Sequence, residues 1–542
     1  MKFKQTGSLV AAAFLFTACA SPISTKNPGF KTHNPDIGGG QILFYTTDGE
    51  FLSAANVGNL PDMVIFSPDG KTVLSANEGE PSDDYRNDPK GSVSIITLGD
   101  PDGNLIQDVT TLFFDDVIIP LDLRIKPGST PAQDIEPEYI AINEAGTKAW
   151  VSLQENNGLA VIDLNSKTIT SVVSLGKKAF TFIDINTKDG ANVAAAPDNV
   201  YGLYQPDTIV SYRVDGKDYV VTANEGDDRE YGAWEDYEKA VVLHKNGEAF
   251  SRQLTEDIIE VKGRKKVRVL KDLGKDKNGT YTSLYLAGTR SFSIWDAEGK
   301  QVYDSGSEFE QKLAAQYPDT FNTRVDDTDD KMDIAELAHT FVPHDMIGDT
   351  AYFWQGVDAR SHKKGCEPEA LAIAKIGSNI FAYIGLEKQG GFFVYDISNP
   401  SKAIFVEYNN DINYGNVPSD SGDLAPEGMV HFEQDKSHYL AIANELSSTV
   451  SIYKLRENGS AGKLASLKVG SFDSGAAEII AYDSAGKKLY VTNGETKNVD
   501  IIDVSTPASP VKSGSINFLE HADKLQSVAV GKGLVAIAVS RR

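Results

Sequence analysis

Short runs of alternating hydrophobic and polar residues recur along the chain in pairs, and turn-forming residues separate the two runs of each pair. In YIAINEAGTKAWVSL (139–153), two β-rich runs flank the polar stretch NEAGTK. This pattern predicts a β-hairpin. A third β-rich run follows each hairpin, and a more polar fourth run usually comes next. The third runs are SVSIITL (92–98), GLAVIDL (158–164), SFSIWDA (291–297), GGFFVYDI (390–397), STVSIYKL (448–455) and NVDIIDV (498–504).

Four-stranded antiparallel units repeated along a chain are typical of a β-propeller, in which each unit is one blade of a ring. The units at 367–423, 426–470 and 477–520 have the length of blades. The unit at 206–304 carries an insertion at about 228–289, between its second and third strands. A further insertion, at about 305–360, precedes the next blade.

The two ends of the chain each supply half a blade. GQILFYTTDGEFLSAANVG (40–58) and LQSVAVGKGLVAIAVSRR (525–542) hold two strands apiece. An open two-strand edge invites aggregation, and pairing the two halves removes that edge. We therefore predict an all-β, seven-bladed propeller over residues 41–542, with one blade shared between the termini.

An acidic residue precedes the first strand of six units, and a second acid follows the second strand. Five of the first acids stand directly after a proline. The pairs are Asp62 with Glu78, Glu138 with Glu155, Asp207 with Glu225, Glu369 with Glu387, Glu427 with Glu445 and, as a looser copy, Glu478 with Glu495. In an antiparallel pair, the start of one strand lies beside the end of its neighbour. Both sets of acids are therefore expected on one face of the ring, near its axis.

Carboxylates gathered in this way need compensation, because two like charges about 4 Å apart repel by about 4 kcal/mol at an intermediate dielectric. They can take up protons, accept backbone hydrogen bonds, pair with basic side chains or bind cations. Oxygen ligands in this number suit Ca²⁺ or Mg²⁺, so we expect these acids, Glu495 excepted, to form a calcium site. In the alternative interpretation, the acids join neighbouring blades by accepting backbone N–H bonds.

Basic residues stand near the predicted acidic mouth. Arg290 precedes a third strand, Arg360 lies in VDARSHKKGCEPE, and Lys388 follows Glu387. Cations beside an acidic metal site can hold a phosphate group, which makes these three the candidate phosphate contacts. Alternatively, these basic side chains only neutralise the acids. The same two roles, phosphate contact or neutralisation, are open to Arg229 in ANEGDDRE.

Charge and the N-terminal segment narrow the class of protein. The net charge of −25 argues against nucleic-acid binding, which needs a basic face.

MKFKQTGSLVAAAFLFTACAS begins with lysines, an apolar core and small residues, which is typical of a signal peptide over 1–18. Cys19 ends a lipobox-like stretch, and Ala20 resembles an outer-membrane sorting signal. We expect an outer-membrane lipoprotein facing the periplasm or the cell surface, with a tether over 19–40 and membrane contact through the lipid alone. The alternative to a lipoprotein signal is an ordinary signal peptide cut near the same place. With Cys19 lipidated, Cys366 would be a lone free thiol.

Seven motifs in order resemble the choice-of-anchor I family: LPDMVIFSPDGKTVLSANEGEPSDD, VVTANEGDDREY, GTRSFSIWD, KGCEPEALAI, YIGLEKQGGFFVYDI, APEGMVHF and AAEIIAYD. That family is similar to mesenchyme-specific cell-surface glycoproteins and to atypical large alkaline phosphatases of bacteria. The resemblance implies a secreted or surface-anchored propeller, calcium dependence and, in some relatives, phosphatase activity.

This chain also departs from the family pattern. Its blades follow a different order, as in a circularly permuted chain, with truncation of a longer chain as the alternative. His362 and Lys363 stand where relatives often have acids, Cys366 where they have proline, and Lys388 where they have arginine. These changes weaken the case for a metal or phosphate site on that blade.

Two hypotheses of different classes follow. The sequence contains no GxSxG, HExxH, Walker A or dinucleotide-binding glycine motif. The first hypothesis is a monomeric, lipid-anchored, calcium-binding scaffold whose insertions contact a glycan or protein ligand. The alternative is a metal-dependent phosphomonoesterase, in which the acids hold metal ions and Arg290, Arg360 or Lys388 stabilises charge on a phosphoester.

Overall fold

The computed structural model describes residues 39–101, 103–192, 196–337, 339–340, 342–519, 521–522 and 524–540. The expected signal peptide (1–18), Cys19 and tether residues 19–38 lie outside this part of the chain. Within it, no helix has both the length and the apolar character needed to cross a membrane. Strands greatly outnumber helices there, as the all-β prediction requires.

Seven four-stranded sheets contain most of the strands in the described residues. In six of them the strands follow one another in chain order, and the predicted third runs are the third strands. Three of the six are β3 (Pro61–Phe66), β4 (Thr72–Asn77), β5 (Ser92–Leu98) and β6 (Ile106–Phe113); β7 (Pro137–Ile142), β8 (Lys148–Leu153), β9 (Gly158–Asp163) and β10 (Thr168–Ser174); and β13 (Ile209–Val214), β14 (Lys217–Ala223), β20 (Phe292–Asp296) and β21 (Gln301–Asp304). The other three are β25 (Pro368–Ile376), β26 (Asn379–Leu386), β27 (Phe392–Asp396) and β28 (Ile404–Asn409); β29 (Pro426–Gln434), β30 (Ser437–Asn444), β31 (Thr449–Leu455) and β32 (Ala461–Lys468); and β33 (Ile480–Asp483), β34 (Lys488–Asn493), β35 (Asn498–Asp503) and β36 (Val511–Asn517).

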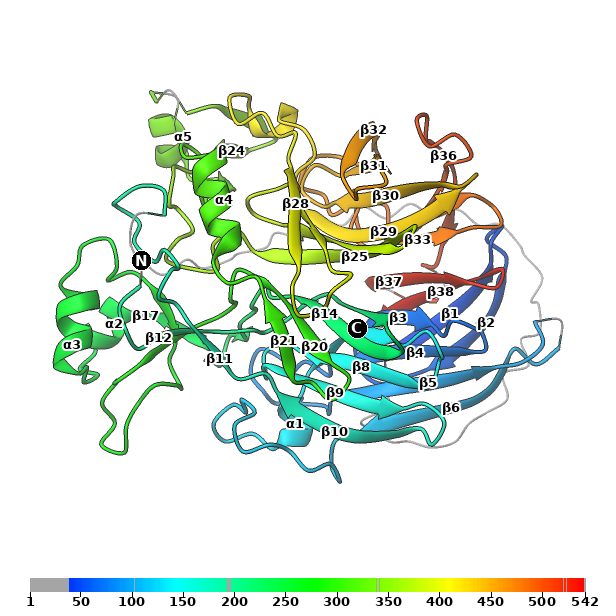
Figure 1. Ribbon diagram of the computed structural model, residues 1–542, viewed down its shortest axis with the longest axis horizontal. Coiled ribbons are helices and arrows are strands. Elements are labelled where there is room, and N and C mark those ends of the chain that lie inside the picture. Colours follow the sequence, from blue (N-terminus) through cyan, green and yellow to red (C-terminus); the bar gives the residue numbers. More distant parts are fainter. Residues whose placement is uncertain are drawn as a thin grey trace, which may run out of the picture. The chain divides into compact units, whose positions relative to one another are not determined.

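The seventh sheet combines strands from both ends of the chain. Its order is β2 (Phe51–Asn56), β1 (Gly40–Thr46), β38 (Leu534–Ser540) and β37 (Lys524–Gly531). β1 pairs with β38 along its whole length, from Gly40 opposite Ser540 to Thr46 opposite Leu534. Figure 1 shows these strands, in blue and red, side by side. The predicted sharing of one sheet between the termini is thus present.

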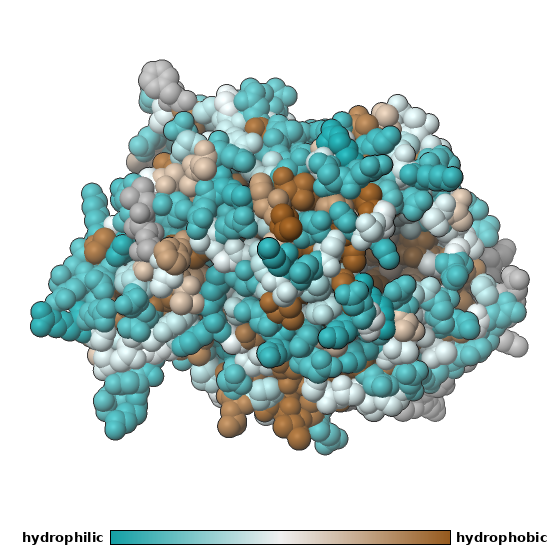
Figure 2. All heavy atoms as spheres, viewed as in Figure 1, coloured by the Kyte–Doolittle hydropathy of each residue, from teal (hydrophilic) through white to brown (hydrophobic). Residues whose placement is uncertain are grey.

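Buried hydrophobic side chains fill the space between successive sheets. One cluster joins β3–β6 to β7–β10, and five further clusters join each later sheet to its successor as far as the terminal sheet. A seventh cluster joins the terminal sheet to β3–β6 through Phe44, Val73 and Ala536. Apolar faces buried between four-stranded sheets are characteristic of propeller blades. The surface visible in Figure 2 is correspondingly largely hydrophilic, with apolar residues in separate patches.

Smaller elements lie in the segments between the sheets. The first group is β11 (Lys177–Ala179), β12 (Val200–Leu203), β15 (Glu230–Tyr231), β16 (Trp234–Glu235), β17 (Tyr237–Lys239), α2 (Ala240–Lys245), α3 (Arg252–Leu254), the π-helix η1 (Thr255–Ile259), β18 (Arg268–Leu270) and β19 (Leu284–Leu286). β12 pairs in parallel with β19, so the segment before β13 joins the expected insertion at about 228–289. These elements share a core of their own, which includes Phe180, Leu243 and Leu284.

A second group of small elements lies around the expected insertion at about 305–360. It comprises α4 (Glu308–Gln316), β22 (Val325–Thr328), α5 (Lys331–Leu337), β23 (His344–Ile347) and β24 (Thr350–Trp354). α4 packs Phe309 and Leu313 into the cluster between β20 and β27. Two short helices stand elsewhere, α1 (Pro131–Asp134) and the 3₁₀-helix η2 (Pro418–Asp420).

Candidate metal centre

β-Bulges lie at the positions of four of the first acids. The register shifts between Pro61 and Met63, Pro137 and Ile140, Pro368 and Leu371, and Pro426 and Gly428. A bulge leaves a residue outside the ladder and redirects its side chain. The preceding proline suits the first position of a strand, because it has no N–H to donate. Asp62, Glu138, Glu369 and Glu427 occupy these bulges, so the same local sequence turns the same side chain out of each sheet.

The acids of both sets act on one another electrostatically. We refer to Asp62, Glu78, Glu138, Glu155, Asp207, Glu225, Glu369, Glu387, Glu427, Glu445 and Glu478 as the strand-end acids. Burial raises the pKa of Tyr139, and the charges of Asp207, Asp62 and Glu427 raise it further. These three acids belong to three different sheets, so they converge on one region. Glu478 also belongs to it, because both Glu445 and Asp62 act on its carboxyl group.

Burial raises the pKa of most strand-end acids, and repulsion among them adds to the effect. The pKa lies well above its ordinary value for Glu78, Glu138, Asp207, Glu369 and Glu427. It rises to about 7 for Glu155 and Glu478 and to about 6 for Asp62. A raised pKa means that the folded protein holds protons where free carboxylates would be charged. A bound cation can take the place of those protons.

Three strand-end acids come close enough to share one ion. Carboxylate oxygens of Glu225, Glu369 and Glu387 all lie within 4.8 Å of one another. Glu225 follows β14, Glu369 lies in β25, and Glu387 follows β26, so two adjacent sheets supply the ligands. Oε2 of Glu369 is buried and has no hydrogen-bond partner among the described residues. Carboxylate oxygens from separate segments suit Ca²⁺, which accepts irregular oxygen coordination.

Lys364 partly neutralises this cluster, and the sequence analysis did not select it. Its ammonium group lies 2.6 Å from Glu225 and 3.2 Å from Asp227. Burial acts to raise the pKa of Glu225, but the charge and hydrogen bond of Lys364, together with the Gln154 hydrogen bond and the charge of Lys388, bring the pKa below its ordinary value. The sequence feature that could have indicated Lys364 is the basic run RSHKKGCEPE, in which the sequence analysis selected Lys363 and not Lys364.

Arg360 and Lys388, two of the candidate phosphate contacts, meet at one buried carboxylate. Arg360 forms an ion pair with Glu367, and Lys388 contacts Glu387 and lies 3.8 Å from Glu367. Burial lowers the pKa of Lys388, while the charge of Glu369 acts in the opposite direction. Both cations therefore stand beside the strand-end acids, and carboxylates already pair with them.

Arg290, the third candidate phosphate contact, lies elsewhere. Its side chain is fully buried and is 2.5 Å from Glu310. It also donates to the backbone oxygens of Asp184, Ser361 and Lys363. The guanidinium group is thus used in joining three segments of the chain, and it is not directed toward the strand-end acids. Arg229 is likewise buried, with Asp134 and Asp236.

The terminal sheet contributes different groups to the same region. In β37 the register shifts between Leu525 and Ser527, which places Gln526 where other sheets carry the first acid. Gln526 hydrogen-bonds to Asp62, and the charge of Lys524 partly opposes the rise that burial causes in the pKa of Asp62 and of Glu478. The search for repeated acids could not find these two residues.

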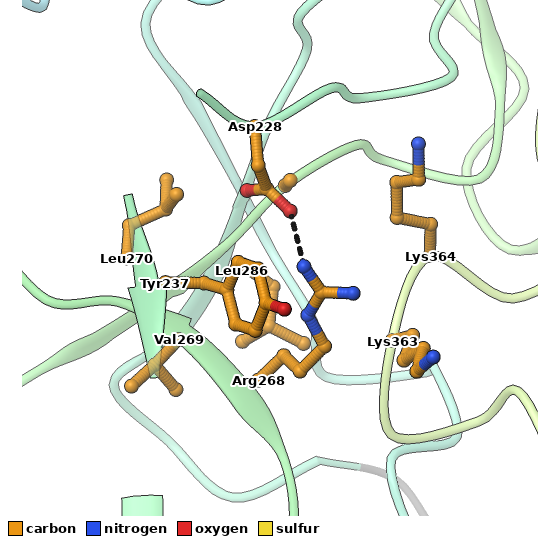
Figure 3. A pocket seen from close by; sticks show the side chains of 9 residues that line it. Asp228, Tyr237, Arg268, Val269, Leu270, Leu286, Lys363 and Lys364 are labelled. Atoms are coloured by element: carbon orange, nitrogen blue, oxygen red, sulfur yellow. Dashed lines mark hydrogen bonds and ion pairs between the residues drawn. The ribbon is translucent and has the colours of Figure 1, made fainter. Parts of the chain in front are cut away.

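A small pocket lies next to Lys364, where the first insertion meets the segment before β25. Figure 3 shows Asp228, Tyr237, Arg268, Lys363 and Lys364 around it. Arg268 is 3.0 Å from Asp228, and its guanidinium lies over the Tyr237 ring, 3.1 Å from the centroid. These interactions hold the arginine against the pocket wall rather than leaving it free for a ligand.

Comparisons with known families give two matches. The model of the choice-of-anchor I domain matches residues 24–400, and that of the LVIVD repeat matches residues 486–517. The LVIVD match covers β34, β35 and β36.

Individual relatives are more distant. Gigasin-3a of Magallana gigas is 32% identical over 135 residues, which is 25% of this chain and 40% of that protein. Periplasmic gluconolactonase of Pseudomonas aeruginosa is 12% identical, with 88% of this chain and 96% of that chain covered and a TM-score of 0.44. The Cps50 (Swd1) β-propeller domain of Myceliophthora thermophila is 7% identical, with 89% and 97% covered and a TM-score of 0.39.

Proposed function

This chain belongs to the choice-of-anchor I family, and we propose that it is an exported, lipid-anchored, seven-bladed β-propeller that binds Ca²⁺ and serves as a binding scaffold. The pairing of β1 with β38 and the cyclic order of the clusters between sheets support a closed ring. In that ring the strand-end acids surround the axis. Residues 1–18 would be the signal peptide, Cys19 the lipidated residue and 19–40 the tether.

The observation that carries the calcium proposal is the proximity of Glu225, Glu369 and Glu387. Their oxygens lie within 4.8 Å of one another, and one oxygen of Glu369 is buried without a hydrogen-bond partner in the described part of the chain. Within the described part of the chain, Glu225 and Glu387 each have an ammonium group in direct contact, and Glu369 has none. A divalent cation would supply the charge that is still missing at Glu369.

The nearby basic side chains are already paired with carboxylates, which favours a scaffold over an enzyme. Arg360 and Lys388 already pair with Glu367 and Glu387, and Arg290 is enclosed with Glu310. A phosphate group would have to displace these carboxylates before it reached the cations. We therefore assign the ion a structural role and place ligand contact on the insertions, with a glycan or a protein as the ligand of a monomeric scaffold.

The test is calcium titration of chelator-treated full-length protein by isothermal calorimetry, with metal content measured after dialysis. We expect saturable Ca²⁺ binding that Glu369→Gln weakens at least tenfold, because the substitution removes the ligand charge and keeps the shape. Glu495→Gln is the matched control: Glu495 also follows a second strand, but it is exposed and bonded to Ser471. Equal affinity of the wild type and Glu369→Gln would refute the proposal.

A phosphomonoesterase remains the second candidate, favoured by the cations that stand beside the strand-end acids. In that case a bound metal ion would polarise a phosphoryl oxygen, while Lys364 and Lys388 would hold charge on the ester. Hydrolysis of p-nitrophenyl phosphate, with Ca²⁺ or with chelator, distinguishes the two functions. Calcium-dependent turnover that Glu427→Gln and Glu369→Gln abolish would establish the enzyme, and turnover unaffected by both would exclude this mechanism.

A further inference from the structure

A second group of carboxylates lies outside the strand-end acids, in a region where the sequence analysis named no acid. Oxygens of Asp184, Asp189 and Asp358 lie within 4.8 Å of one another. Asp184 and Asp189 stand between β11 and β12, and Asp358 follows β24, so two distant segments meet here. Asp184 and Asp358 are almost fully buried, at 0% and 1% exposure.

The backbone around these carboxylates is firmly held. The N–H of Asp184 donates to Glu310, and its carbonyl accepts from Arg290. The N–H of Asp358 donates to the carbonyl of Phe321. The positions of the side chains are therefore set by the surrounding structure, as a preformed site requires.

The side-chain oxygens are less well satisfied than the backbone. Oδ2 of Asp184 and Oδ1 of Asp189 are buried and have no hydrogen-bond partner among the described residues. Asp358 accepts from the Gly190 N–H and the Ser361 hydroxyl, so it alone has both oxygens bonded. A buried polar atom left without a partner costs about 1–3 kcal/mol, and more when it is charged.

Among the described residues, no basic side chain forms an ion pair with these three carboxylates. The guanidinium group of Arg290 donates to the backbone carbonyl of Asp184, but its ion pair is with Glu310. Burial is the main cause that raises the pKa of Asp184 to about 7 and that of Asp358 to about 6, and the charges of nearby carboxylates add to it. Three acids that share one small volume thus lack a compensating positive charge.

We propose that Asp184, Asp189 and Asp358 form a second divalent-cation site, distinct from the strand-end acids. The partnerless oxygens of Asp184 and Asp189 would be ligands, and Asp358 would complete the carboxylate set. A ligand set of carboxylates alone, without His or Cys, suits a hard cation such as Ca²⁺.

The ion would act as a clamp between the segment that precedes β13 and the segment that follows β24. Asp358 opens the segment that supplies Arg360 and Lys364, and Asp358 also receives the hydrogen bond from Gly190. A cation held by both segments would fix this loop and, through it, the lysine that pairs with Glu225. Chelation would then loosen the loop while the four-stranded sheets stay folded.

The experiment combines calcium stoichiometry with hydrogen exchange on full-length protein. We expect Asp184→Asn and Asp189→Asn each to lower the bound Ca²⁺ by one ion per chain. We also expect Ca²⁺ to slow exchange of amides in 184–190 and 356–364 in the wild type, and this protection to be lost in both variants. Asp198→Asn, at an exposed position of the same segment, is the matched control.

The outcomes separate this site from the strand-end acids. Glu369→Gln must leave the calcium-dependent protection of 184–190 intact, whatever it does to total binding. If Ca²⁺ fails to protect 184–190 and 356–364 in the wild type, or if Asp184→Asn and Asp189→Asn bind as much Ca²⁺ as the wild type, the second site does not exist. Asp189→Asn provides a check in case Asp184→Asn does not fold, because the Asp189 carboxylate accepts from the Asn186 side chain and from no backbone N–H of the described residues.

Discussion

Two carboxylate-rich regions of this protein deal with their charge in opposite ways. Around Arg124 and Arg229, the acids Asp134, Asp236 and Asp272 meet guanidinium groups at 2.6–3.4 Å. Although burial acts to raise the pKa of Asp236, the charges of Arg124 and Arg229 and the hydrogen bonds from Arg124 and Trp234 together hold it below its ordinary value. Among the strand-end acids, burial and mutual repulsion raise the pKa of most members.

This difference in how the carboxylates are neutralised indicates which region needs a cation from solution. Buried guanidinium groups complete the first region from within the chain. In the second, Lys364 neutralises Glu225, but Glu138 and Glu369 each keep a buried oxygen without a partner in the described residues. The first region should therefore respond to substitution and hardly to calcium, whereas the second should respond to calcium and pH.

The largest effect is expected from Arg229→Met. It leaves Asp134 and Asp236 short of a partner in a site where Arg229 is 1% exposed. Breaking a buried ion pair by removing one partner costs about 3–5 kcal/mol. Urea unfolding should show this loss with and without Ca²⁺. Arg86→Met is the control, because Arg86 is exposed, and a similar loss there would remove the distinction between buried and surface pairs.

The next effect is a dependence of stability on pH that calcium suppresses. Glu155 and Glu478, with pKa values of about 7, and Asp62, with about 6, hold protons in the folded state that the unfolded chain releases near pH 4. The folded state binds more protons, so stability must fall as pH rises from about 5 to about 8. Calcium at a hundredfold excess over Kd should restore about 2.7 kcal/mol at pH 8. Thermal unfolding between pH 5 and pH 8 measures both, and stability that rises over this range would contradict the prediction.

A smaller effect is expected from Lys364→Met. The ammonium group competes with a metal ion for Glu225, so its removal should tighten Ca²⁺ binding about tenfold, or about 1.4 kcal/mol. Calorimetry at pH 8 measures the change, with Lys375→Met, at an exposed position of β25, as the control. Weaker binding would show that Lys364 positions Glu225 for the ion rather than competing with it.

The smallest effect is expected from Gln526→Glu, which gives the terminal sheet the acid that the other six carry. The added charge lies beside Asp62 and should lower stability by about 1 kcal/mol or less in chelator at pH 8. Saturating Ca²⁺ should remove the loss. Gln107→Glu adds the same charge at an exposed site of β6, and an equal response there would mean that the effect is not local.

Much of the fold could be predicted from the sequence, because hairpins and third strands are local patterns. The turn in YIAINEAGTKAWVSL and the alternation around it determine β7, β8 and their register. Pairing of β1 with β38 followed from the incomplete sheets at the two ends. The convergence of Asp62, Asp207 and Glu427 followed from strand direction alone.

The remaining site residues depend on contacts between distant segments, which no local pattern records. Arg290 precedes a strand just as the acids do, yet its partner Glu310 lies in α4 of an insertion. Asp184 and Asp358 are far apart in the chain, and they meet only because the segment before β13 packs against the segment after β24. Lys364 was missed because its neighbours in the run of basic residues carried equal weight.

The pairing of β1 has a mechanical consequence. Seven residue pairs join β1 to β38, from Gly40 opposite Ser540 to Thr46 opposite Leu534. A force applied along β1 through the segment before Gly40 would act in shear. It would load the hydrogen bonds of β1 with β38 and with β2 at the same time, instead of breaking them one after another. A molecule held at this end would yield only when many hydrogen bonds fail together, so the terminal sheet is suited to carry load.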